Sequence, residues 1–121
     1  MNKIEIFKQY NLEERTLQFA KNVALYVQQL PKNISNLEYG KQLVRSSGSV
    51  GANYIEANES LSKKDFIMRI KISRKEAKES AYWQELIVET NDEKYKQNGI
   101  LLHDEAVELK KIFSSILIKS E

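Results

Sequence analysis

The chain is poor in residues that break helices and in residues that bind metals. Its 121 residues include no cysteine, one proline, one histidine and four glycines. Without cysteine, the protein cannot form a disulfide or use a thiolate as a nucleophile or metal ligand. A lone histidine, His103, is a poor basis for a histidine-based metal site. So few helix breakers favour a small number of long helices over many short strands.

Long apolar runs are also missing. No stretch approaches the about 20 apolar residues that cross a bilayer, and the first residues lack the apolar segment of a secretory signal. We therefore expect a cytoplasmic protein that does not enter a membrane. Charged residues make up 30% and apolar residues 41% of the sequence, as in an ordinary folded domain. The length suits one domain over residues 1–121.

The spacing of apolar residues predicts four helices, over about residues 12–30, 37–61, 63–90 and 102–119. Capping-box patterns at Asn11, Ser35 and Ser62 predict where three of them begin, and Pro31 closes the first. Short connections make consecutive helices antiparallel neighbours. The predicted fold class is therefore all-α, an up-down-up-down antiparallel four-helix bundle.

Three local expectations accompany this fold. The turn dipeptide Asn98-Gly99 is expected to precede the last helix. The core line of the first helix is expected at Leu17, Ala20, Ala24 and Val27, with a second line beside it at Phe19, Val23, Tyr26 and Leu30. Residues 1–11 form a lead-in that is expected to pack on a neighbour through Ile4, Ile6 and Phe7.

The second helix has three distinct faces. Its core face consists of Leu43, Ser47, Val50, Tyr54, Ala57 and Leu61. A polar stripe on roughly the opposite side consists of Arg45, Ser49, Asn53 and Glu56. We interpret this stripe as structural, so that Glu56→Ala should lower stability or break an oligomer. Between them runs a smooth apolar strip, which indicates close packing against Val44, Gly48, Gly51, Ala52 and Ile55.

The third helix carries a second apolar stripe besides its core line. The stripe consists of Met68, Ile72, Tyr82, Trp83 and Leu86. A helix in a monomeric bundle needs one such stripe, so the second predicts an interface with another subunit. The alternative is that two neighbouring helices of the same bundle share this surface.

Positive charge is concentrated in the same helix. Residues 63–78 hold seven cations and two carboxylates, a local net charge of +5 in a chain whose total is +2. Four lysines fall within about 60° of one helical face, at Lys64, Lys71, Lys75 and Lys78. With the nearby Arg69 and Arg74, they predict a nucleic-acid-binding surface. The alternative is a solvated face with partners one turn away, such as Lys75 and Glu79.

No pattern predicts a catalytic residue, a cofactor or a metal. The segment Ser46–Gly51 superficially resembles a phosphate-binding loop but lacks the Gly-Lys-Ser/Thr ending. Glu56, Glu59, Glu76 and Glu79 could pair across two helices, but a di-metal bundle also needs a Glu-x-x-His motif, which is missing. The alternative is a structural role, in which these carboxylates form ion pairs with Arg45, Arg74 and Lys78. We expect no enzymatic activity.

The two middle helices resemble the 23S rRNA intervening-sequence protein family of bacterial four-helix bundle proteins. The resemblance spans roughly residues 19–117 and is carried by Arg45-x-x-x-Ser49-x-x-x-Asn53-x-x-Glu56, then Ser62-Lys-Lys-Asp-Phe66 and Lys75-Glu-Ala-Lys-Glu-Ser-Ala-Tyr-Trp83. One departure is Ala57-Asn58, where many members have Glu followed by Gly. The resemblance implies a ring-shaped homopentamer without enzymatic activity. It also implies kinship with retroelement accessory variability proteins, which bind nucleic acid through a basic surface.

The sequence leaves three function classes open. The first is a homo-oligomeric, non-enzymatic protein that binds RNA or a ribonucleoprotein through the basic residues. The second is a protein-interaction scaffold without nucleic-acid binding, docking near Trp83. The third, a small metal-dependent enzyme, would require a bound metal.

Overall fold

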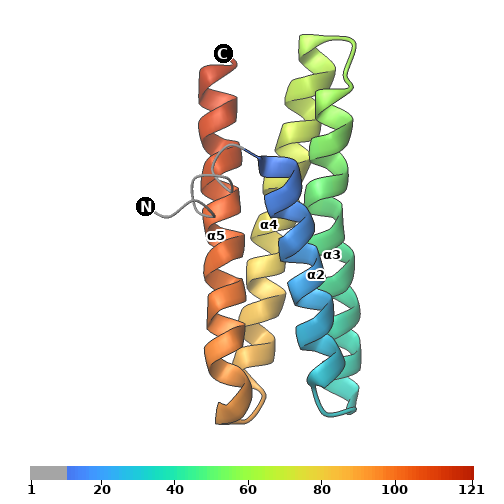
Figure 1. Cartoon of the computed structure of the whole chain (residues 1–121), viewed down its shortest axis with the longest axis vertical. Helices are drawn as coiled ribbons and strands as arrows, with labels where there is room; N and C mark the ends of the chain where they lie inside the picture. Colours follow the sequence, from blue (N-terminus) through green and yellow to red (C-terminus); the bar gives the residue numbers. More distant parts are fainter. Residues whose placement is uncertain (1–10) are drawn as a thin grey trace.

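Four long helices make up nearly all of the computed structural model, which describes residues 11–121. They are α2 (Leu12–Gln29), α3 (Ile34–Asn58), α4 (Lys63–Glu89) and α5 (Lys96–Lys119), and a short 3-10 helix, η1 (Glu93–Tyr95), leads into α5. Figure 1 shows them running alternately up and down. The predicted all-α, up-down-up-down four-helix bundle is therefore confirmed. Ile4, Ile6 and Phe7, expected to pack on a neighbour, lie outside the described residues.

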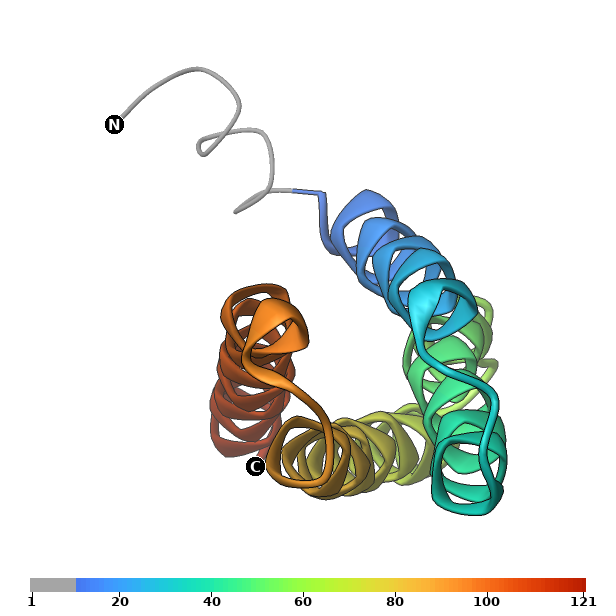
Figure 2. The ribbon, with the colours of Figure 1, turned by 90° about the horizontal axis from the view of Figure 1, so that it is seen from below.

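The helices follow one another around the bundle in chain order. Viewed end-on, α2, α3, α4 and α5 form an arc, with α2 and α5 at its two ends (Figure 2). The interfaces of α4 with α3 and with α5 are the most extensive, and α2 packs chiefly on α3. Within residues 11–121, no helix is both long and apolar enough to cross a bilayer.

Two of the three predicted helix starts coincide with the observed caps. The side chain of Asn11 accepts a hydrogen bond from the Glu14 amide at 3.0 Å, and that of Ser62 accepts one from the Asp65 amide at 3.1 Å. The start predicted at residue 37 is wrong. Asn33, rather than Ser35, accepts from the Asn36 amide at 2.8 Å, so α3 begins at Ile34.

The predicted end of the second helix at residue 61 is also wrong. The helix ends at Asn58, and Leu61, expected in the core, is fully exposed in the turn. The cap at Ser62 explains the difference, because its extended backbone must precede the first turn of α4.

The last helix begins at Lys96, six residues before the predicted start at 102. Asn98-Gly99, predicted as a turn, therefore lies inside α5. Gly99 is needed there for packing, since a Cβ atom at this position would lie 2.6 Å from the Tyr26 hydroxyl and would collide with Val88.

The core line predicted for the first helix is wrong, because the helix is rotated so that the neighbouring apolar line faces the core. Leu17 is 60% exposed, whereas the line placed beside it is buried, at Phe19, Val23, Tyr26 and Leu30. The core face of α3 is confirmed except for Leu61, with Leu43, Ser47, Val50 and Ala57 buried and Tyr54 half-buried. Both lines of α2 have helical spacing, and only contact with α3 and α5 decides which one faces inward.

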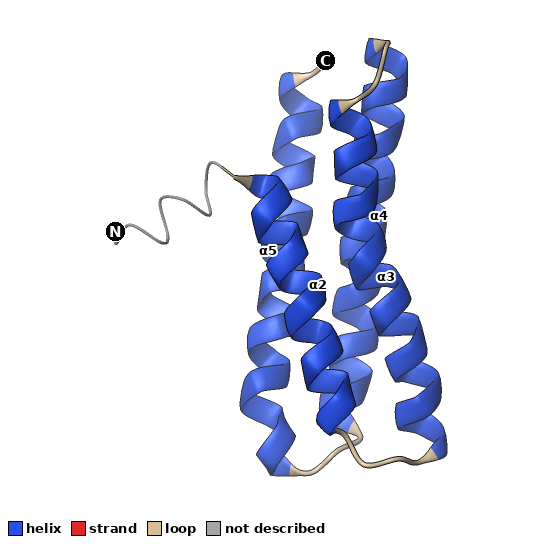
Figure 3. Ribbon diagram, turned by 45° about the vertical axis from the view of Figure 1, so that its right-hand side comes forward, coloured by secondary structure: helices blue, strands red, loops and turns tan. Residues whose placement is uncertain are grey.

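The helix α2 is shorter than the other three and leaves one end of the bundle with three helices. It has 18 residues, against 25, 27 and 24 in α3, α4 and α5. Figure 3 shows its first residues well below the turn that joins α3 to α4. Core side chains at that end are consequently only half-buried, as at Tyr54, Phe66 and Ile116.

Candidate nucleic-acid interface

A row of lysines follows one face of α4. Lys64, Lys71, Lys75 and Lys78 are exposed, and none of them forms an ion pair with a residue in the range 11–121. Glu79, the expected partner of Lys75, pairs instead with Arg45 of α3, at 3.0 Å. The four charges are therefore free to meet an anion from solvent. We call them the lysine face.

The two arginines predicted beside these lysines are placed differently. Both are half-buried. Arg69 points toward α3, where its Nη1 donates a hydrogen bond to Oδ1 of Asn53 at 3.0 Å. Arg74 forms no ion pair with any described residue. The lysine face thus carries the accessible charge, and Arg69 already has a partner within the bundle.

The polar stripe of α3 lies along α4. Arg45 reaches two carboxylates one turn apart, with Nη1 at 3.0 Å from Glu76 and Nη2 at 3.0 Å from Glu79. The hydrogen bond and charge of the buried Glu76, followed by those of Glu79, raise the pKa of Arg45 above its ordinary value. Of the basic residues proposed to pair with these carboxylates, Arg45 does so, and Arg74 and Lys78 do not.

Besides the bond that Asn53 accepts from Arg69, the remaining members of the stripe bond within α3 or form no described bond. Ser49 donates to the Arg45 carbonyl, and the Asn53 amide donates to the Ser49 carbonyl, each at 2.9 Å. Glu56 is exposed, and its carboxylate forms no ion pair within the part of the chain that the structure describes.

The second apolar stripe of α4 is split between the bundle and its surface. Trp83 packs inward, with its ring centroid 6.0 Å from that of Tyr39 in α3 and 5.1 Å from that of Tyr82. Met68 and Tyr82 point outward and are 46% and 58% exposed. Ile72 and Leu86 are half-buried. Met68, Ile72, Tyr82 and Leu86 form what we call the α4 ridge.

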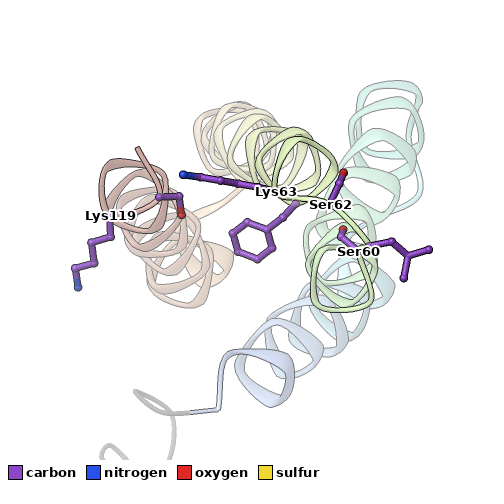
Figure 4. Close-up of a pocket in the computed structure, with 7 residues that line it drawn as sticks. Ser60, Ser62, Lys63 and Lys119 are labelled. Carbon is purple, nitrogen blue, oxygen red and sulfur yellow. The ribbon is translucent and has the colours of Figure 1, made fainter.

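A hollow of about 550 Å³ lies at the three-helix end of the bundle, between the α3–α4 turn and the end of α5. Figure 4 shows the side chain of Lys63 extending toward α5, and that of Lys119 pointing away from the hollow. The hydroxyls of Ser60 and Ser120 donate to carbonyls of their own helices, and Ser62 caps α4. The lining groups do not converge on a common point, so this hollow is a weaker candidate than the lysine face.

The lone histidine, His103, lies next to a carboxylate on α5. Its Nδ1 lies 3.1 Å from the carboxylate of the adjacent Asp104. Across residues 11–121, no group of three or more histidines, aspartates and glutamates could hold a metal ion.

The sequence analysis missed the hydrogen bond between Asn53 and Arg69, and it gave the ion pair between Arg45 and Glu76 only as one alternative. The spacing of these residues from the turn could have predicted both pairs. In an antiparallel helical hairpin, residues equally distant from the turn face each other, and both pairs are centred on the turn at residues 59–62.

Comparison with known proteins identifies the family. The chain matches the 23S rRNA-intervening sequence protein family over residues 8–115. It is also similar to a crystal structure, at 1.70 Å resolution, of a protein of unknown function from the S23 ribosomal protein family of Bacteroides thetaiotaomicron VPI-5482. The two chains are 32% identical, with a TM-score of 0.72, over 87% of this chain and 96% of the other. No curated protein matches. The chain therefore belongs to the 23S rRNA-intervening sequence protein family.

Proposed function

We propose that this chain is a non-enzymatic, homo-oligomeric protein that binds structured RNA, alone or in a ribonucleoprotein, through the lysine face of α4. One observation carries the proposal. Four exposed lysines follow one helical face, and none is neutralised by a described carboxylate. The name of the family points to 23S ribosomal RNA as the first RNA to test.

The chemistry of the lysine face favours phosphates over bases. Lysine ammonium groups contact backbone phosphates without reading sequence, so binding is electrostatic and weakly specific. Four contacts from one subunit give modest affinity, and an oligomer multiplies them by presenting several faces to one RNA.

The exposed part of the α4 ridge supports the homo-oligomer. Met68 and Tyr82 have large side chains that remain 46% and 58% exposed in one subunit. Full burial of an exposed side chain of this size contributes about 1.5–3 kcal/mol, and burial of the exposed half contributes about half of that, which favours association. Subunit contact through Met68, Ile72, Tyr82, Trp83 and Leu86 therefore remains part of the proposal, with Trp83 contributing from within the α3–α4 contact.

The test is a titration of the purified protein with a structured fragment of 23S ribosomal RNA at several salt concentrations, from about 50 to 200 mM. We expect affinity to fall steeply with salt. The double variant Lys71→Glu, Lys75→Glu should lose most of its binding. A matched control, Lys21→Glu with Lys111→Glu on α2 and α5, changes the net charge equally and should bind almost normally. Equal losses in both variants would show that net charge, and not this face, drives binding.

A protein-interaction scaffold is the second candidate, and the exposed Met68 and Tyr82 are the observation that favours it. Absence of RNA binding even at low salt would support this candidate. In that case, a pull-down after nuclease treatment should recover a defined protein, and Met68→Glu should abolish its capture.

A further inference from the structure

The three-helix end of the bundle has an apolar surface that α2 is too short to cover. Tyr54 of α3, Phe66 of α4 and Ile116 of α5 pack against the core, and each is only half-buried. The ring centroid of Tyr54 lies 5.9 Å from that of the buried Phe113, so this surface continues directly from the core. Phe66 also lines the adjoining hollow of about 550 Å³. We call Tyr54, Phe66 and Ile116 the open apolar surface.

The described part of the chain starts beside this surface. Asn58, the last residue of α3, lies one turn beyond Tyr54 and donates a hydrogen bond to the Glu13 carboxylate at 3.0 Å. Leu12, the first residue of α2, is half-buried against the core. The first turn of α2 therefore lies next to the end of α3 that carries the open apolar surface.

Residues 1–10 precede α2 and supply apolar side chains of the right kind. Three large apolar residues fall within four positions, at Ile4, Ile6 and Phe7. An extended chain spans about 3.3 Å per residue, so Phe7 can reach about 13 Å from Asn11 and Ile4 about 23 Å. Both residues are consequently within reach of a surface that begins at the first turn of α2.

These residues cannot cover the surface as a straight continuation of α2. Asn11 caps this helix, and its backbone, with φ −122° and ψ 82°, is not helical. The inward line of α2 at this end consists of Thr16 and Leu12. One turn earlier, a continued helix would place Lys8 or Gln9 on that line, and both are polar. The apolar residues can therefore face the bundle only as a separate segment that changes direction at Asn11.

The tether favours the surface of the same chain over that of a second copy. A segment on a short linker meets its own bundle at an effective concentration on the order of millimolar. At micromolar protein, the corresponding segment of another copy is far more dilute. Binding within one chain therefore wins unless the geometry of the linker forbids it, and the reach from Asn11 allows it.

We propose that Ile4, Ile6 and Phe7 pack on the open apolar surface of their own bundle and complete the core where α2 ends. Residues 1–10 then form a strap that joins α3, α4 and α5 at the three-helix end. The strap goes beyond the proposed function, since it requires neither RNA nor a second copy.

Hydrogen exchange of the full-length protein, at a concentration where it is monomeric, tests the packing. Phe7→Ser should expose the end of α5, and amides of residues 113–119 should exchange about tenfold faster, which corresponds to about 1.4 kcal/mol. The matched control is Lys8→Ser, which removes the neighbouring polar side chain and should leave these amides unchanged. Equal exchange in the two variants would overturn the strap. The bundle itself should fold in both, because neither position lies within its helices.

Engineered cysteines test the location, since the natural chain has none. The double variant Phe7→Cys, Ile116→Cys should form a disulfide within one 14.1 kDa chain on oxidation. The control is Phe7→Cys, Leu17→Cys, because Leu17 is 60% exposed on α2 and only about 9 Å along that helix from Asn11. A free segment reaches both positions, so equal rates of oxidation would overturn the strap.

The mass of the oxidised product separates the remaining outcomes. A disulfide between two chains would place the segment on a second copy and would overturn packing within one chain. The RNA titration is independent of all these variants, because the lysine face is intact in each. A failed strap with normal RNA binding would leave the proposed function standing, and the reverse result would overturn only the proposed function.

Discussion

Arg15 of α2 and Glu105 of α5 form an ion pair with two hydrogen bonds between the first and the last helix. Nε donates to Oε2 at 2.8 Å and Nη2 donates to Oε1 at 2.7 Å. The hydrogen bond to Glu105 raises the pKa of Arg15 above its ordinary value. The interface between α2 and α5 is otherwise much smaller than that between α3 and α4, so this pair is a principal link across it.

We expect Glu105→Ala to lower the free energy of unfolding by about 1–2 kcal/mol, because it leaves the half-buried guanidinium of Arg15 without its acceptor. Urea denaturation measures the change. The control is Glu108→Ala, which removes the exposed partner of Lys111, at 3.6 Å, on the same helix. That change should cost less than about 0.5 kcal/mol. Equal losses would mean that the Arg15–Glu105 pair does no more than an ordinary surface pair.

Gly99→Ala should destabilise the bundle although alanine is the better helix former. Its methyl group would collide with Val88 and press on the Tyr26 hydroxyl, which donates to the Tyr95 carbonyl at 2.9 Å. We expect a loss of about 1–3 kcal/mol in thermal or urea unfolding. Gly48→Ala, measured at concentrations where the protein is monomeric, should instead gain up to about 1 kcal/mol. A gain at both positions would contradict the close packing of Gly99.

Gln84 is a buried polar residue whose replacement should stabilise the protein. Neither amide atom of Gln84 has a hydrogen-bond partner among the described residues. An unsatisfied buried amide costs about 1–3 kcal/mol, so Gln84→Met should raise the free energy of unfolding by about 1 kcal/mol. Gln97→Met, at an exposed site, should change it little. A loss of stability in Gln84→Met would reveal a partner such as an internal water.

Two members of the polar stripe should have different roles: Arg45 stabilises the fold, and Glu56 affects only the association of copies. Arg45→Ala leaves the buried carboxylate of Glu76 unpaired and should cost about 1–2 kcal/mol. Glu56 is exposed without a described ion pair, so Glu56→Ala should leave monomer stability within about 0.5 kcal/mol. Its effect should appear only in the concentration at which copies associate, measured by sedimentation. A large loss of monomer stability in Glu56→Ala would restore the purely structural interpretation of the stripe.

The sequence was sufficient for the features that depend on local periodicity. Apolar spacing located the four helices, and short side-chain caps located the starts of α2 and α4. The lysine face was also visible, because it needs only the geometry of one helix.

The predicted start and end of α3 were wrong because the local cap at Asn33 and the extended backbone of the cap at Ser62 were not considered, and the other errors concern features that depend on neighbouring helices. Two apolar lines of α2 have the same helical spacing in the sequence. Only contacts with the other helices determine that Phe19 is buried and Leu17 is exposed. Asn98-Gly99 had the composition of a turn, yet Gly99 serves the approach of α5 to Tyr26 and Val88. Among the candidate site residues, Arg69 had the same charge as its neighbours, and only the position of Asn53 shows that it is engaged. Local chemistry identified the basic face, and the hairpin register decided which charges remain available.

The short α2 also has a consequence for motion. This helix packs mainly on α3 and has only a small interface with α5, whereas α4 packs between the long helices α3 and α5. Partial opening can therefore detach α2 while the hairpins of α3, α4 and α5 stay paired. In amide hydrogen exchange, α2 should lose its protons through this low-energy opening, and the centre of α4 should retain its protons until the whole bundle unfolds.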